Sequence, residues 1–187
     1  MDIARNSTLV ERVARGDSRA FAAIVEEHKD SLVNYLSHLA GCPEEAEELA
    51  QEAFLRLYRA APRYREEGRL APYLFRIATN LLRSQRRRQR RWSLLRPRLQ
   101  ASHPGQPADS ASQELLTDEL CGQVRAAIAE LPMRFRVPLI LHEIEGWSYR
   151  RIAAAESCRE GTVKSRIHRA RGMLRSKLAP YWNGGSH

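Results

Sequence analysis

The most informative segment of the chain lies at residues 146–175 and reads GWSYRRIAAAESCREGTVKSRIHRARGMLR. Ser148 is a residue type that caps helix N-termini, and the apolar spacing after it predicts a short helix over residues 149–156. A turn is expected at residues 157–159, followed by a second helix from about residue 160 to 175. The segment therefore predicts two helices joined by a tight turn.

The second of these helices has two unlike faces. Its apolar stripe contains Val163, Ile167, Ala170, Met173 and Leu174. Its other face carries hydrogen-bonding and cationic side chains, namely Thr162, Lys164, Ser165, Arg166, His168, Arg169 and Arg171. This pattern predicts a helix-turn-helix, in which the first helix sets the angle and the second enters the major groove of DNA.

The whole chain has 187 residues, enough for one or two small domains, and its 31 Lys+Arg against 22 Asp+Glu give a formal charge of +9. This excess predicts a polyanionic partner. No apolar run reaches about 18 residues. Asp2 and Arg5 interrupt the stretch where a secretory signal would lie, so we expect a soluble, cytoplasmic protein.

The cysteines are far apart and odd in number: Cys42, Cys121 and Cys158. They predict neither a disulfide framework nor a zinc-binding pair, and we expect no metal site and no cofactor. Small buried thiols are the expectation, with redox sensing as the alternative.

Charge is distributed unevenly along the chain. Residues 1–60 hold 7 basic and 11 acidic side chains, whereas residues 61–100 hold 12 and 2. Residues 101–130 hold 1 and 5, and residues 131–187 hold 11 and 4. Each basic block follows an acidic one, which indicates separate acidic and cationic surfaces on one polypeptide.

Strand signals are nearly absent and a 3.6-residue apolar period recurs, which predicts an all-α fold with two small helical domains joined by a flexible linker. A helix capped by Asp17 or Ser18 is expected to end at Gly41. The next helix is expected to begin at Pro43 and to end near Pro62. Its predicted apolar stripe contains Ala46, Leu49, Ala50, Ala53, Phe54, Leu57 and Tyr58.

A polar loop is predicted at residues 63–71, followed by a helix that opens at Pro72. This helix runs into the arginine-rich residues 83–91, where its apolar face stops. Such a density of like charge must be solvated or lie on an anion. Residues 96–112 are rich in proline and lack a helical stripe, which predicts a linker.

Two more helices are predicted between this linker and the helix-turn-helix. The first ends at Pro132, and the second ends at Gly146. Pro138 falls inside the second, so we expect a kink or a late helix start there.

Several runs of this sequence resemble a known family. Three of them are Glu130-Leu-Pro-Met-Arg-Phe-Arg-Val-Pro-Leu, Glu143-Ile-Glu-Gly-Trp-Ser-Tyr-Arg-Arg-Ile-Ala and Gly161-Thr-Val-Lys-Ser-Arg-Ile-His-Arg-Ala-Arg. They resemble the domain of extracytoplasmic-function sigma factors, in the sigma-70 family, that reads the promoter −35 element. Two earlier runs, Ala46-Glu-Glu-Leu-Ala-Gln-Glu-Ala-Phe-Leu-Arg-Leu-Tyr and Tyr73-Leu-Phe-Arg-Ile-Ala-Thr-Asn-Leu-Leu, resemble that family's first domain. The resemblance covers about residues 7–179.

The resemblance implies a non-catalytic factor for promoter-specific transcription initiation. Residues 7–92 would bind core RNA polymerase and recognise and melt the −10 element, residues 93–112 would be the linker, and residues 113–180 would read the −35 element. The implied partners are core polymerase, through its clamp helices and flap, and promoter DNA, with no small-molecule substrate. An anti-sigma protein, membrane-linked or zinc-containing, would hold the two domains until a signal such as stress arrives.

The resemblance also assigns residues to each contact. Core polymerase would be bound by Glu48, Leu49, Gln51, Glu52 and Leu55. The −10 element would be bound by a loop at about residues 63–70 and the helix after it, through Arg63, Tyr64, Arg65, Tyr73, Arg76, Asn80, Arg83, Arg86 and Arg87. The −35 element would be bound by Thr162, Lys164, Ser165, Arg166, His168 and Arg169.

The chain departs from the family pattern in the turn of the helix-turn-helix. Glu156 and Ser157 stand where the family usually has Leu-Gly, and Arg159 and Glu160 replace the usual Pro and Val. A leucine would close the core under the turn, so either the turn is rotated or Glu156 points outward to an arginine. Tyr73 stands where tryptophan is common, which leaves a smaller stacking surface.

Other interpretations of the sequence remain open at this point. A repressor or activator that binds duplex DNA alone, as a dimer, would use residues 146–175. An RNA-binding adaptor would use the arginine run, which also fits a non-specific nucleic-acid tail. The acidic segment fits a solvated helix face, and Tyr64 and Tyr73 fit core or rim aromatics. An enzyme has little support because His142-Glu143 lacks the second histidine of a zinc protease and no glycine-rich phosphate loop occurs.

Overall fold

The computed structural model describes residues 9–65, 69–95 and 115–182. Within these ranges the chain is helical and has no strand, as the sequence predicts. The named helices are α2 (Ser18–Ala40), α3 (Pro43–Ala60), the 3-10 helix η1 (Ala61–Arg63), α4 (Leu70–Leu95), α5 (Leu115–Ala129), α6 (Met133–Glu143), α7 (Tyr149–Glu156) and α8 (Glu160–Trp182). None of the described helices is long and apolar enough to cross a bilayer.

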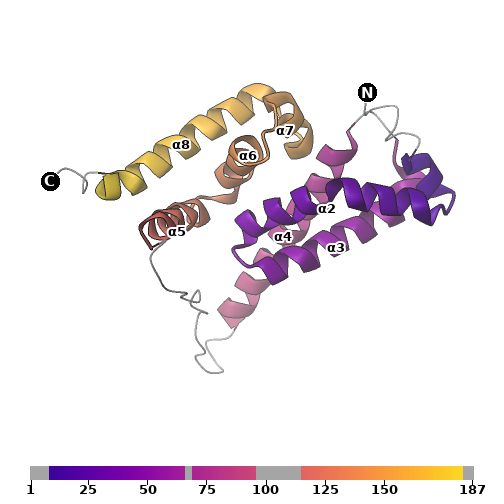
Figure 1. The fold of residues 1–187 in the computed structure, drawn as a ribbon, viewed down its shortest axis with the longest axis horizontal. Coiled ribbons are helices and arrows are strands. Elements are labelled where there is room, and N and C mark those ends of the chain that lie inside the picture. The colour runs from indigo at the N-terminus through magenta and orange to yellow at the C-terminus, as the bar shows by residue number, and fades with distance from the viewer. Residues whose placement is uncertain (1–8, 66–68, 96–114, 183–187) are drawn as a thin grey trace.

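Helices α2, α3 and α4 pack together as a first helical group (Figure 1). Asp17 caps α2 by accepting hydrogen bonds from the backbone N–H groups of Arg19 at 2.9 Å and Ala20 at 3.1 Å. Gly41 ends α2 with a φ of 80°. A side chain in this left-handed conformation costs about 1–2 kcal/mol, which glycine avoids. Both ends of α2 agree with the prediction.

A buried tyrosine ties α2 to α4 in this group. Tyr35 is fully buried, and its hydroxyl donates to Oγ1 of Thr79 at 2.7 Å. Thr79 uses its own proton to donate to the backbone carbonyl of Phe75, also at 2.7 Å. Burial raises the pKa of Tyr35 because the phenolate loses its hydration. These bonds fix the rotation of α4, and with it the direction in which its polar side chains point.

Helices α5 to α8 form a second group around α8. Its core contains Leu131, Phe135, Val137, Leu139, Ile140, Trp147, Ile152, Val163, Ile167 and Ala170. Ser148 caps α7 as predicted, accepting from the N–H of Arg151. Pro138 is buried inside α6, which begins well before it at Met133, so the late helix start is wrong. A proline lacks the N–H that an interior helical residue donates, but its ring here adds apolar surface to the core.

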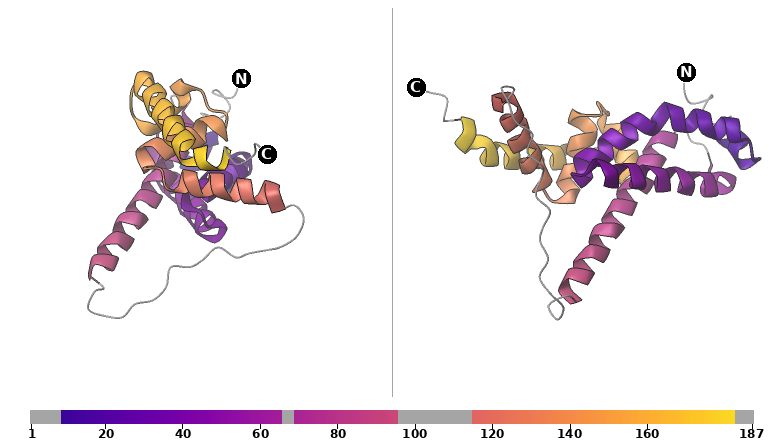
Figure 2. Two further views of the ribbon diagram at one scale, coloured as in Figure 1. Left: turned by 90° about the vertical axis from the view of Figure 1, so that its left-hand side faces the viewer. Right: turned by 60° about the horizontal axis from the view of Figure 1, so that its bottom comes forward.

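The two groups pack side by side, with α4 against α7 and α2 against α6 (Figures 1 and 2). The C-terminal part of α4 extends away from both groups (Figure 2), and its residues 87–93 are exposed. The arginine run is therefore helical, and its part from Arg87 onward is solvated, which is one of the two outcomes that its charge density allows. The fold places the helix that follows the predicted −10 loop directly beside the helix-turn-helix.

Some local expectations differ from the structure. Residues 9–14 form an unpredicted helical turn, and its Leu9, Val10 and Val13 are buried. Cys42 and Cys158 are only half-buried, so the prediction of buried thiols is wrong for both, while the side chain of Cys121 lies outside the described residues. The predicted linker begins within α4, which continues to Leu95, and the rest of it falls outside the described residues.

Candidate nucleic-acid interface

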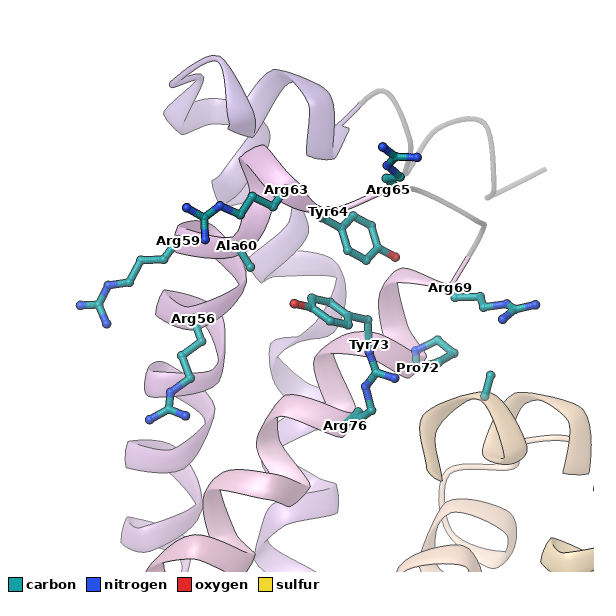
Figure 3. A pocket seen from close by; sticks show the side chains of 11 residues that line it. Arg56, Arg59, Ala60, Arg63, Tyr64, Arg65, Arg69, Pro72, Tyr73 and Arg76 are labelled. Carbon is teal, nitrogen blue, oxygen red and sulfur yellow. The ribbon is translucent and has the colours of Figure 1, made fainter. Parts of the chain in front are cut away.

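A cationic pocket of about 620 Å³ lies between the end of α3 and the start of α4 (Figure 3). Its arginines come from α3, from η1 and the residues after it, and from α4: Arg56, Arg59, Arg63, Arg65, Arg69 and Arg76. None of the described residues that line it is acidic. A hollow with cations on several sides and no described carboxylate suits a phosphate-bearing ligand.

Two aromatic rings lie inside this pocket. Tyr64 and Tyr73 pack with their ring centroids 4.8 Å apart and their planes tilted by 36° (Figure 3). The guanidinium of Arg76 lies over Tyr73, 5.2 Å from the ring centroid. Flat rings beside cations form the kind of platform on which an unstacked base rests. Both tyrosines are half-buried, so each keeps exposed surface at the pocket.

The remaining predicted −10 residues follow along α4 and differ in exposure. Asn80 and Arg87 are exposed. Arg86 donates to the carbonyl of Ala40 at 2.7 Å and lies 3.4 Å from Glu45, so it caps the C-terminal end of α2. The structure thus gives Arg86 a structural partner that the sequence pattern did not reveal.

The proposed reading face of α8 is open to solvent over most of its length. Lys164, Ser165, His168 and Arg169 are exposed, whereas Thr162 and Arg166 are half-buried. The turn before α8 forms without the family's glycine because Ser157 adopts the left-handed conformation, with φ of 52° and ψ of 46°. The turn therefore keeps helix-turn-helix geometry in spite of its unusual residues.

Glu156 is the other departure from the family pattern. It pairs with arginines, which is one of the two alternatives that the sequence left open. Its side chain is only 5% exposed and accepts from Arg83 of α4 and from Arg166 of α8. The carboxylate is buried between the two helical groups rather than exposed at the protein surface.

The residues of α3 that the resemblance assigns to core polymerase form an acidic face, of which one residue is buried and the others are exposed or half-exposed. Glu48 and Gln51 are exposed, and Leu55 is an apolar side chain with 46% exposure. Glu52 accepts from Arg56 at 2.8 Å, which lowers the pKa of its carboxyl. Leu49 is 6% exposed and packs in the core, so the structure removes it from the exposed face.

Tyr58 adds to this face, although the apolar period predicted it to lie inside. It is 42% exposed, one turn beyond Leu55, and packs edge-on against Phe21 at 5.1 Å. Exposed large apolar side chains with polar side chains around them are typical of a protein-binding surface. The apolar spacing of α3 placed Tyr58 on the buried stripe, so the sequence did not reveal that its ring is exposed.

Two family models match the chain. The model described as "Sigma-70 region 2" matches residues 24–92, and "Sigma-70, region 4" matches residues 121–174. The RNA polymerase sigma-H factor of Pseudomonas aeruginosa is 34% identical over 183 residues, covering 94% of this chain and 95% of that protein. The ECF RNA polymerase sigma-E factor of Escherichia coli K12 is 31% identical, with 94% and 95% of the two chains covered. The chain belongs to the extracytoplasmic-function sigma factors.

Solved structures agree with this family. The sigma factor RpoE from Bartonella quintana, in complex with the anti-sigma factor NepR, has 27% identity and a TM-score of 0.65, covering 85% of this chain and 96% of that one. CnrH, in complex with the cytosolic domain of CnrY, shares the fold with a TM-score of 0.69 at 22% identity, covering 94% and 97%. As a sigma factor, the chain binds core RNA polymerase and the −10 and −35 promoter elements and directs promoter-specific initiation.

Proposed function

We propose that this sigma factor divides initiation among three surfaces. The exposed face of α3, with Glu48, Gln51, Glu52 and Leu55, binds the clamp helices of core polymerase. The pocket around Tyr64 and Tyr73 takes a flipped base of the melted −10 element. The first half of α8 reads the −35 element, with Lys164 and Arg169 as exposed cations.

The observation that carries this proposal is the tyrosine pair in the arginine-lined pocket. Extruding a base costs a few kcal/mol, and stacking on an aromatic ring returns about 1–3 kcal/mol per base. The pocket therefore nearly offsets one flipped base, while opening a longer bubble requires the polymerase. A factor that reads duplex DNA alone has no use for such a pocket, which favours the initiation function over a free-standing repressor.

The domain limits follow from the same division. Residues 7–92 form the polymerase and −10 module, residues 93–112 the linker, and residues 113–180 the −35 module, which also meets the polymerase flap. The factor works in the cytoplasm and contributes no chemical step of its own. An anti-sigma protein is its proposed regulator, which the Bartonella quintana complex supports, since that relative is seen bound to one.

Capture of purified core polymerase tests the α3 surface. Replacing Leu55 by Asp places a charge where an apolar contact is expected, so the variant should lose most of its capture. Replacing Glu26 by Lys, on an exposed position of α2, is the matched control and should leave capture unchanged. Full capture by L55D, or equal loss in both variants, would overturn the assignment of this surface.

A further inference from the structure

One carboxylate joins the two proposed DNA-reading helices. Nη2 of Arg83, on α4, lies 3.1 Å from Oε1 and 3.2 Å from Oε2 of Glu156. Nη1 of Arg166, on α8, lies 3.4 Å from Oε2 of the same residue. The Glu156 side chain is 5% exposed, against 33% for Arg83 and 29% for Arg166. A single buried anion is thus shared by a −10 arginine and a −35 arginine.

The neighbouring contacts make this a continuous interface rather than an isolated ion pair. Arg76 donates to Oγ of Ser157 at 3.0 Å, and the rings of Phe75 and Trp147 lie 4.6 Å apart. Ala154 of α7 also lines the tyrosine pocket. The helix-turn-helix therefore covers part of the face of α4 that the proposed function gives to promoter DNA.

A second set of contacts closes the interface on the side of α2. Glu145 accepts from Ser31 at 2.5 Å and from Asn34 at 2.8 Å. Arg136 of α6 donates to the backbone carbonyl of Leu39 at 3.2 Å. These bonds are polar and partly exposed, so they contribute little to stability. Among the polar contacts of the interface, the buried charge of Glu156 costs most to disturb.

The chemistry of the cluster makes DNA a competitor of Glu156. Guanidinium groups bind carboxylates and phosphates with the same fork of N–H donors. Promoter phosphates therefore need the same Arg83 and Arg166 groups that the carboxylate holds. A leucine at position 156, the residue that the family resemblance predicts, would pack under the turn without neutralising either arginine.

We propose that Glu156 latches the free chain in a closed form by holding Arg83 and Arg166 away from DNA. This inference rests on the proposed function, because it takes the DNA roles of α4 and α8 from it. In the closed form the two arginines share one carboxylate, and the tyrosine pocket is partly covered by α7. Opening separates α7 from α4 and releases both cations for promoter phosphates.

The test compares Glu156→Gln with wild type as full-length chains without polymerase. Gln keeps the size of the side chain but removes its charge. We expect a larger radius of gyration by small-angle X-ray scattering and an affinity for a labelled random duplex, at fixed salt, about tenfold higher, since apparent affinity follows the fraction of open molecules. Glu156→Leu should behave the same way, and it replaces E156Q in the test if circular dichroism shows that E156Q does not fold.

Glu160→Gln is the matched control. Glu160 is exposed in the first turn of α8, so its loss makes the same change of charge near the DNA face without touching Arg83. An unchanged radius in E156Q and E156L, or an equal gain in affinity in E160Q, overturns the latch. Transcription with core polymerase is assayed separately. If no variant yields a promoter-specific start, the proposed function fails, while scattering still decides whether Glu156 holds the chain closed.

Discussion

The ring of Trp147, in the turn before α7, packs against the ring of Phe75 on α4 with a centroid distance of 4.6 Å. Both rings are buried, at 3% and 1% exposure, and they come from different helical groups. The guanidinium of Arg151 lies over the ring of Trp147, 3.9 Å from its centroid. The apolar core is therefore continuous from one group to the other, and the two groups should unfold together.

Replacing Trp147 by Ala should break this continuity. The loss of a large buried ring costs about 3–5 kcal/mol. The wild type should melt in one transition by calorimetry, and W147A should melt at lower temperature in two. Trp92 supplies the control, because it is 64% exposed and its replacement by Ala should change the free energy of unfolding by less than about 0.5 kcal/mol. A single, unshifted transition in W147A would contradict the shared core.

A largely buried histidine, His28, predicts how stability depends on pH. His28 lies on α2 with its side chain 11% exposed, and burial lowers its pKa below the ordinary value of 6.5, an effect that Arg151 reinforces and Glu27 opposes. The unfolded chain thus binds a proton at a pH where the folded chain does not. The stability of the folded chain is therefore unaffected by His28 above the pKa that this residue has in the unfolded chain. It falls as the pH drops below about 6.5, because the unfolded chain then binds the proton more readily.

The measurement is the free energy of unfolding in urea at a series of pH values from neutral to mildly acidic. His28→Gln should lose part of the decline that wild type shows below neutral pH. His168→Gln, a change at an exposed position of α8, should keep the wild-type decline. Identical profiles for H28Q and wild type would mean that His28 is not the group that titrates.

Local features of this fold are predictable because the residues that cause them lie at the same place in the sequence. The ends of α2 depend on the Asp17 carboxylate and on the positive φ of Gly41, and both are visible as residue types. The N-terminus of α7 is similarly local, since Ser148 caps it, whereas the left-handed conformation of Ser157 is not visible from a serine in the sequence. The family resemblance adds the order of the two modules.

Contacts between the two groups are not predictable in this way. Arg83 and Glu156 are 73 positions apart, and each helical pattern shows only which face is apolar. The sequence therefore indicated an arginine as a candidate partner of Glu156 without showing which one. Leu49 and Tyr58 show a finer limit: both lie on the predicted stripe of α3, yet one is 6% and the other 42% exposed, because the neighbouring helices cover only part of that stripe.

The tyrosine pocket predicts a defect in promoter melting. Replacing Tyr73 by Ala removes a stacking surface worth about 1–3 kcal/mol per base, so open-complex formation by the holoenzyme should fall by roughly 5- to 150-fold. Tyr73→Trp should retain or exceed wild-type activity, because the indole offers a larger ring. Fluorescence of a base analogue in the −10 element reports melting. Equal melting by Y73A and wild type would show that Tyr73 is a rim aromatic only.

The exposed cations of α8 predict weaker −35 binding that leaves polymerase capture intact. Lys164 and Arg169 are better targets than Arg166, because Arg166 is held by Glu156 and its removal would also disturb the interface. Replacing both Lys164 and Arg169 by Ala should weaken −35-dependent transcription and lower the slope of binding against salt by about one for each phosphate that the variant no longer binds. Lys177→Ala is the control, since Lys177 lies near the far end of α8 and pairs with Glu130. If the double variant fails to capture core polymerase instead, α8 does not serve DNA alone and the division between the surfaces of α3 and α8 is wrong.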